Sequence, residues 1–260
     1  MKLSDYFDDT VRSIAFLSRI PVPTSFFSGT GPSISGGVQT FPLAGALILA
    51  GPAILLWLLL AADAPVYLAA FLVLTLQTMI TGALHEDGLS DAADGLFGGR
   101  DKDHALTIMK DSRVGSYGVI AMVLSFGLRA SAIGAIAMRI DPIEAALCLP
   151  AVAALSRALM VWHWSAIGPA KTDGVAASQG EPTRDAVTAA LIAAVIVAFA
   201  LLWPSAGFAP MLFASAMAAL ACAAFTAFVR KCIGGHTGDT IGATQQICEC
   251  LMLASLALAV

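Results

Sequence analysis

Four carboxylates lie within residues 86–94 of a chain that is otherwise strongly apolar. Residues 84–97 read Leu-His-Glu-Asp-Gly-Leu-Ser-Asp-Ala-Ala-Asp-Gly-Leu-Phe, whereas only 12% of the chain is charged and its mean hydropathy is +0.83. Each residue of a helix advances by about 100°, so Asp91 and Asp94 fall about 40° and about 20° to either side of Asp87. The three aspartates therefore share one narrow stripe.

Carboxylates in such a stripe need a positive partner. Like charges one helical turn apart repel by about 0.2–0.5 kcal/mol at an exposed site, and by more where the medium is less polar. Carboxylate oxygens are the ligands that Mg²⁺ prefers, so we expect Asp87, Asp91 and Asp94 to bind this ion. Gly88 and Gly95 would let a ligand or a second helix come close. The simpler alternative is a helix end capped where it meets water.

Two further motifs could complete such a site. Residues 109–118 bring the cations Lys110 and Arg113 together with serine hydroxyls and glycine amides, a set that suits phosphate. Residues 234–239, Gly-Gly-His-Thr-Gly-Asp, form a glycine-rich turn before a helix, where amides such as that of Gly235 can hold an anion and Asp239 can join the metal. The alternative for residues 109–118 is that the basic residues only flank a helix end. The alternative for residues 234–239 is an ordinary interhelical loop.

Other polar or aromatic residues fall in or beside apolar runs. Arg129 and Arg157 lie inside such runs. Each is functional, extends its charged end to the membrane surface, or pairs with a carboxylate. His85 is a base, a partner of the groups that bind the metal, or a structural residue. Trp162 and Trp164 fit an aromatic belt at a membrane interface.

Seven long, nearly uncharged runs surround these motifs, at 38–62, 65–84, 114–138, 142–161, 186–203, 209–229 and 240–260. Each is close to the roughly 20 residues that a transmembrane helix needs. The pattern predicts an all-α, polytopic integral membrane protein with about seven transmembrane helices and one membrane-embedded catalytic domain over 1–260. Residues 1–37 form its N-terminal segment and 85–113 its acidic and basic active-site segment. Residues 4–20 read either as an amphipathic helix on the membrane or as a cytosolic cap helix.

The distribution of lysine and arginine predicts the orientation. With the N-terminus in the cytoplasm, eleven basic residues lie on the cytoplasmic side and only Arg139 lies opposite, which follows the positive-inside rule. Every long loop then faces the cytoplasm. We expect a multi-pass protein of the cytoplasmic (inner) membrane with its active site on the cytoplasmic face, and no nucleic-acid partner.

The motifs resemble those of the cobalamin synthase (adenosylcobinamide-GDP ribazoletransferase) family. The similar segments are the Asp-Gly-x-x-Asp-x-x-Asp-Gly pattern that begins at Asp87, Met-Lys-Asp-Ser-Arg at 109–113, Gly-Gly-His-Thr-Gly-Asp at 234–239, and Arg-Ile-Pro-Val-Pro at 19–23. The resemblance extends from about residue 12 to the last helix. Glu86 departs from it, because the family usually has an apolar residue there.

The resemblance implies a reaction and its participants. α-Ribazole, or its 5′-phosphate, would attack the diphosphate of adenosylcobinamide-GDP, giving adenosylcobalamin, or its 5′-phosphate, and GMP. Mg²⁺ would be the cofactor, held by the stripe and Asp239, with Asp94 as an alternative base for the ribazole hydroxyl. Lys110 and Arg113 would hold the GDP phosphates and Asp111 would orient one of them. A homo-oligomer and contacts with other cobalamin-assembly enzymes are compatible with this role.

Two other classes share part of the pattern. CDP-alcohol phosphotransferases also carry an Asp-Gly-rich helix, but they have an Ala-Arg pair after the first Asp-Gly and a longer gap before the later aspartates. An ion-coupled transporter would place carboxylates within its spans, whereas these cluster beside one span on one face. Release of GMP from adenosylcobinamide-GDP would distinguish a cobalamin synthase from both of these classes.

Overall fold

The computed structural model describes residues 3–27, 34–171 and 180–260. In these residues the protein is helical, and the single extended pairing is an isolated bridge between Pro169 and His236. The parts of the predicted loops at 28–33 and 172–179 lie outside the described residues. The α-helices are α1 (Leu3–Leu17), α2 (Phe41–Ala61), α3 (Val66–Thr81), α4 (Leu84–Gly98), α5 (Lys102–Ile108), α6 (Ser116–Ala137), α7 (Pro142–Ala166), α9 (Arg184–Ala206), α10 (Phe208–Ile233) and α11 (Gly238–Ala259).

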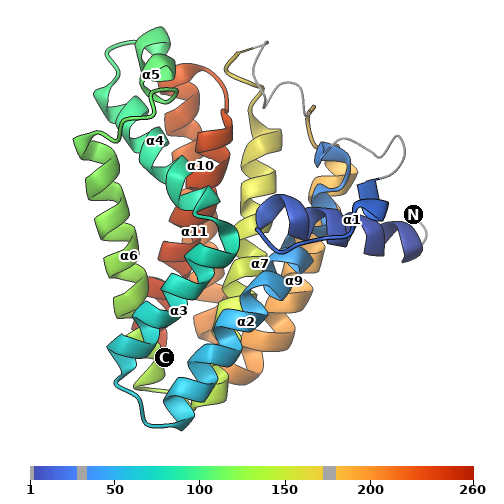
Figure 1. The fold of residues 1–260 in the computed structure, drawn as a ribbon, viewed down its shortest axis with the longest axis vertical. Coiled ribbons are helices and arrows are strands. Elements are labelled where there is room, and N and C mark those ends of the chain that lie inside the picture. Colours follow the sequence, from blue (N-terminus) through green and yellow to red (C-terminus); the bar gives the residue numbers. More distant parts are fainter. Residues whose placement is uncertain (1–2, 28–33, 172–179) are drawn as a thin grey trace.

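The long helices form a bundle whose axis runs vertically in Figure 1. Among the described residues, α2, α6, α7, α9, α10 and α11 are long and apolar enough to cross a membrane, and α3 together with α4 passes the same test as a bent pair. The prediction of an all-α protein with about seven spans is therefore confirmed by length and composition.

Helices α7 and α11 occupy the centre of the bundle. Within their apolar windows 83% and 72% of the residues are buried, compared with 28% in α9 and α10. Small residues allow the close approach: Ala151, Ala153 and Ala158 of α7 are fully inaccessible. A capping box, in which Asp141 and Glu144 satisfy free backbone amides, fixes where α7 begins.

A bend of 90° separates α3 from α4. Gly82 ends α3 in the left-handed conformation with φ 65°, and Ala83 follows with φ 59°. A side chain at position 82 would collide with the Arg19 side chain, so this turn needs glycine. The Arg19 amide also donates to the Ile80 carbonyl at 2.7 Å. The bend turns the acidic helix away from α3 and against α6 and α11.

Helix α1 lies across the bundle axis rather than along it (Figure 1). Its Ser13 hydroxyl is 2.8 Å from that of Thr40, and Phe16 stacks on Phe41 with ring centroids 5.9 Å apart. Its other side leaves Phe7 exposed. Residues 4–20 are therefore helical over most of their length and pack against the start of α2.

Candidate active site

The acidic segment forms a helix, as predicted, and it packs directly on the start of α11. A Cβ placed on Gly88 would lie 3.0 Å from the Asp239 carbonyl oxygen and 3.3 Å from the Gly242 Cα, so the two backbones are in contact there. This contact brings the α4 stripe to Asp239, and Asp91 lies close enough to feel the charges of Asp87, Asp239 and Asp94. These four carboxylates therefore lie near one another where α4 meets α11.

Three of the four carboxylates have little to neutralise them. In the described residues, no hydrogen bond or ion pair reaches the side chains of Asp87 and Asp91, and Asp239 accepts a single hydrogen bond from the Thr237 hydroxyl at 3.3 Å. No group of three or more histidine, cysteine or acidic side chains in this part of the chain is arranged so that it could hold a metal ion by itself. Any bound cation would need ligands from water or substrate.

Asp94 is engaged differently. Its carboxylate oxygens accept hydrogen bonds from the backbone amides of Gly115 at 2.7 Å and Gly118 at 2.9 Å. A Cβ at Gly118 would lie 2.4 Å from this carboxylate, so glycine is required for the approach. Two of the amides that the sequence offered for phosphate are therefore used by Asp94, which joins α4 to the start of α6.

The basic residues of the 109–118 motif lie in two different environments. Lys110 lines the cavity described below. Arg113 binds Asp111 in a forked ion pair, with a shortest distance of 2.6 Å between Arg113 Nη2 and Asp111 Oδ2. Hydrogen bonds from Arg113 lower the pKa of Asp111 to about 2. The expected orienting contact is present, although the Arg113 side chain is 87% exposed and does not line the cavity.

The glycine-rich turn has a packing role as well. Backbone hydrogen bonds join His236 to Gly168 and Ala170, each at 2.9 Å. A Cβ on Gly235 would come within 2.4 Å of the Gly168 carbonyl oxygen, so only glycine fits. Gly235 does not line the cavity, whereas the next four residues, 236–239, do.

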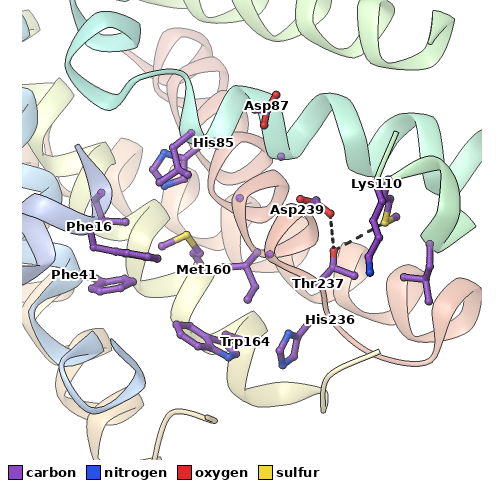
Figure 2. A pocket seen from close by; sticks show the side chains of 18 of the residues that line it. Phe16, Phe41, His85, Asp87, Lys110, Met160, Trp164, His236, Thr237 and Asp239 are labelled. Carbon is purple, nitrogen blue, oxygen red and sulfur yellow. Dashed lines mark hydrogen bonds between the residues drawn. The ribbon is translucent and has the colours of Figure 1, made fainter. Parts of the chain in front are cut away.

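A cavity of about 530 Å³ lies between α1, α4, α7 and the start of α11. Figure 2 shows Asp87, Asp239, Thr237 and Lys110 toward one side, and aromatic side chains with Met160 toward the other. The lining residues are Phe16, Leu17, Phe41, Leu84, His85, Asp87, Gly88, Leu106, Met109, Lys110, Met160, Trp164, Lys171, His236, Thr237, Gly238, Asp239, Ile241 and Gly242.

Sequence reasoning missed the aromatic side of this cavity. Trp164 was expected in an interfacial belt, but it is only 3% exposed and lines the cavity. His236 is 1% exposed, and burial lowers its pKa to about 4, so it is neutral near pH 7. Lys171 also lines the cavity. The signal that could have found Trp164 is its position at the end of α7, on the same side as the glycine-rich turn.

A buried ionic cluster lies behind the carboxylate stripe. Arg129 of α6 is 3.2 Å from Glu86 and 3.1 Å from Glu249, and all three side chains are at most 5% exposed. Arg157 is also fully buried and donates to the Ala153 carbonyl at 3.2 Å. Glu86 is therefore a buried ion-pair partner, and of the alternatives for Arg129 the structure shows pairing with carboxylates.

Comparison with known proteins identifies the family. The family model described as cobalamin-5-phosphate synthase matches residues 9–257. The chain belongs to the cobalamin-5-phosphate synthase family. It is 51% identical over 259 residues, covering 100% of both chains, to the adenosylcobinamide-GDP ribazoletransferase of Rhizobium johnstonii. Proteins of the same name from Sinorhizobium medicae and Azorhizobium caulinodans are 48% identical (100% of this chain, 99% of the relative) and 40% identical (97% and 96%).

No solved structure matches the chain at a significant level. In this member of the cobalamin-5-phosphate synthase family, the motifs lie together in space. Its aspartate helix, its glycine-rich turn and Lys110 meet at one cavity.

Proposed function

We propose that this protein is an adenosylcobinamide-GDP ribazoletransferase. It joins adenosylcobinamide-GDP to α-ribazole, or to α-ribazole 5′-phosphate, and releases GMP. The observation that carries this proposal is the family match over residues 9–257, together with relatives of this name that align with the full chain. Substrates and a lipid bilayer are its partners.

The test is direct. Purified protein in detergent or lipid, supplied with adenosylcobinamide-GDP, α-ribazole and Mg²⁺, should release GMP and form adenosylcobalamin in equal amounts. Omission of α-ribazole should abolish both products. GMP release without a cobalamin product, or no turnover by protein of verified folding, would contradict the proposal.

We also propose that Asp87, Asp91 and Asp239 bind Mg²⁺. The fit rests on their free oxygens and on the absence of a neutralising cation beside them in the described residues. Mg²⁺ typically takes one or two carboxylates and completes its shell with water and substrate phosphate, so a site that is not closed by protein alone suits it. When bound, the ion would offset the negative charge that develops on the diphosphate oxygens.

The remaining residues act on substrate groups and on each other. Lys110 at the cavity, and Arg113 oriented by Asp111, would bind the phosphates of GDP. Asp94 is held by two amide hydrogen bonds and does not line the cavity, whereas Asp87 does. Asp87 would therefore be the base for the ribazole hydroxyl if Asp91 and Asp239 hold the ion without it. Asp94 would then position the 109–118 segment.

The protein is proposed to lie in the cytoplasmic membrane with its N-terminus and active site in the cytoplasm. The support is the eleven-to-one bias of basic residues. A reporter inserted near Gly180 should then be active in the cytoplasm, and one fused after Val260 should be active outside. Both reporters on the same side would contradict the seven-span topology.

A further inference from the structure

The cavity has two chemically different ends. One carries the charged and hydroxyl groups of Asp87, Asp239, Thr237 and Lys110. The other, which we call the aromatic end, is formed by Phe16, Phe41, Met160, Trp164 and His236. Figure 2 shows Phe16, Phe41 and Trp164 on the other side of this space from Asp87, Asp239 and Lys110, with His236 at the border beside Thr237. A ligand that fills the cavity must therefore combine an apolar, flat part with a part that tolerates carboxylates and a cation.

The aromatic end contains polar atoms that lack partners. The indole Nε1 of Trp164 and both ring nitrogens of His236 are buried and have no hydrogen-bond partner in the described residues. An unsatisfied buried polar group of this kind is costly, so these atoms are expected to meet a ligand or water. Indole can only donate, so the group that meets Trp164 must be an acceptor.

From this we infer that the aromatic end binds the benzimidazole base of α-ribazole, with the Trp164 indole N–H donating to the free ring nitrogen of the base. The inference rests on the proposed function. Benzimidazole is an apolar bicyclic ring with a single free acceptor nitrogen, which matches aromatic walls, the Met160 thioether and one indole donor.

The other large substrate groups match less well. Guanine carries donors and acceptors around its edge, whereas Phe16, Phe41 and Met160 offer none. At this end only Trp164 and His236 could pair with them. The corrin ring with its amide side chains is far larger than a nucleoside, whereas a cavity of about 530 Å³ is in the ordinary range for a small ligand. With the base at the aromatic end, the ribose points toward Asp87 and Asp239, where its hydroxyl meets the diphosphate.

The test compares Trp164→Phe with Trp162→Phe. The first substitution keeps an aromatic ring and removes the donor, while Trp162 is a neighbouring, half-buried tryptophan that does not line the cavity. Calorimetry with α-ribazole alone should show an affinity about tenfold lower for Trp164→Phe and unchanged for Trp162→Phe. The analogue in which carbon replaces the free ring nitrogen should bind the wild type and Trp164→Phe equally.

The kinetic readout makes the assignment specific. Trp164→Phe should raise the KM for α-ribazole and leave the KM for adenosylcobinamide-GDP unchanged. An effect on adenosylcobinamide-GDP alone, or equal loss of affinity for α-ribazole and its carbon analogue, would overturn the inference. Binding without turnover in the wild type would contradict the proposed function and leave the base site standing.

A second measurement uses the wild-type protein, in case the variant misfolds. A photoreactive benzimidazole riboside should label peptides that contain Met160, Trp164 or His236, and excess α-ribazole should suppress the labelling. Suppressible labelling confined to other peptides would overturn the inference.

Discussion

Asp91→Asn is expected to slow GMP release by at least about a hundredfold while leaving the protein in the membrane. Asp91 lies between the charges of Asp87, Asp239 and Asp94 and makes no hydrogen bond or ion pair in the described residues. Its carboxylate therefore has no structural task there, and the amide of asparagine is nearly the same size. The loss should come from weaker Mg²⁺ binding, so the Mg²⁺ concentration that gives half-maximal activity should rise.

The matched control for this variant is Asp103→Asn. Asp103 is exposed on the nearby α5 and is not among the carboxylates whose charges act on Asp91, so the change removes the same charge outside the acidic group. Its activity should stay within about twofold of the wild type, as for most surface changes. Near-normal turnover by correctly inserted Asp91→Asn, or an equal loss in both variants, would contradict a metal-binding role.

Arg129→Met is expected to lower the free energy of unfolding by about 3–5 kcal/mol. The Arg129 side chain is fully buried, and its removal leaves Glu86 and Glu249 with less compensation for their charge. The measurement is thermal unfolding of purified protein in detergent, where the transition should move to a clearly lower temperature.

The control is the double variant Arg129→Met, Glu86→Gln. It removes one charge of each sign and leaves Glu249 with Arg157, whose charges already act on each other. The double variant should recover most of the lost stability, because replacing both members of a buried pair costs far less than removing one. A double variant less stable than Arg129→Met alone would show that Arg129 does not act through Glu86.

Much of the site could be predicted because its signals are local. The spacing of Asp87, Asp91 and Asp94 predicts a shared helix face, and the helix α4 carries them as expected. Asp239 could be added because the basic-residue bias places both motifs on one side. Such arguments need only helical periodicity and sidedness.

The remaining features depend on contacts between distant segments. Glu86 lies off the stripe, and its partner Arg129 comes from α6, 43 residues away. Trp164 resembles an interfacial residue until the cavity wall encloses it. The bend at Gly82 is likewise fixed by Arg19, from a segment that precedes two helices. No local pattern specifies these pairings.

The contact at Gly88 also determines what can vary elsewhere in the molecule. Main-chain atoms of α4 and α11 touch there, so the spacing of the acidic groups is set by atoms that every amino acid shares. Exposed side chains elsewhere on either helix, such as Phe97 of α4 and Leu258 of α11, can therefore change without altering that spacing. The arrangement of the carboxylates and the character of the exposed surface are in this way determined by different atoms of the same two helices.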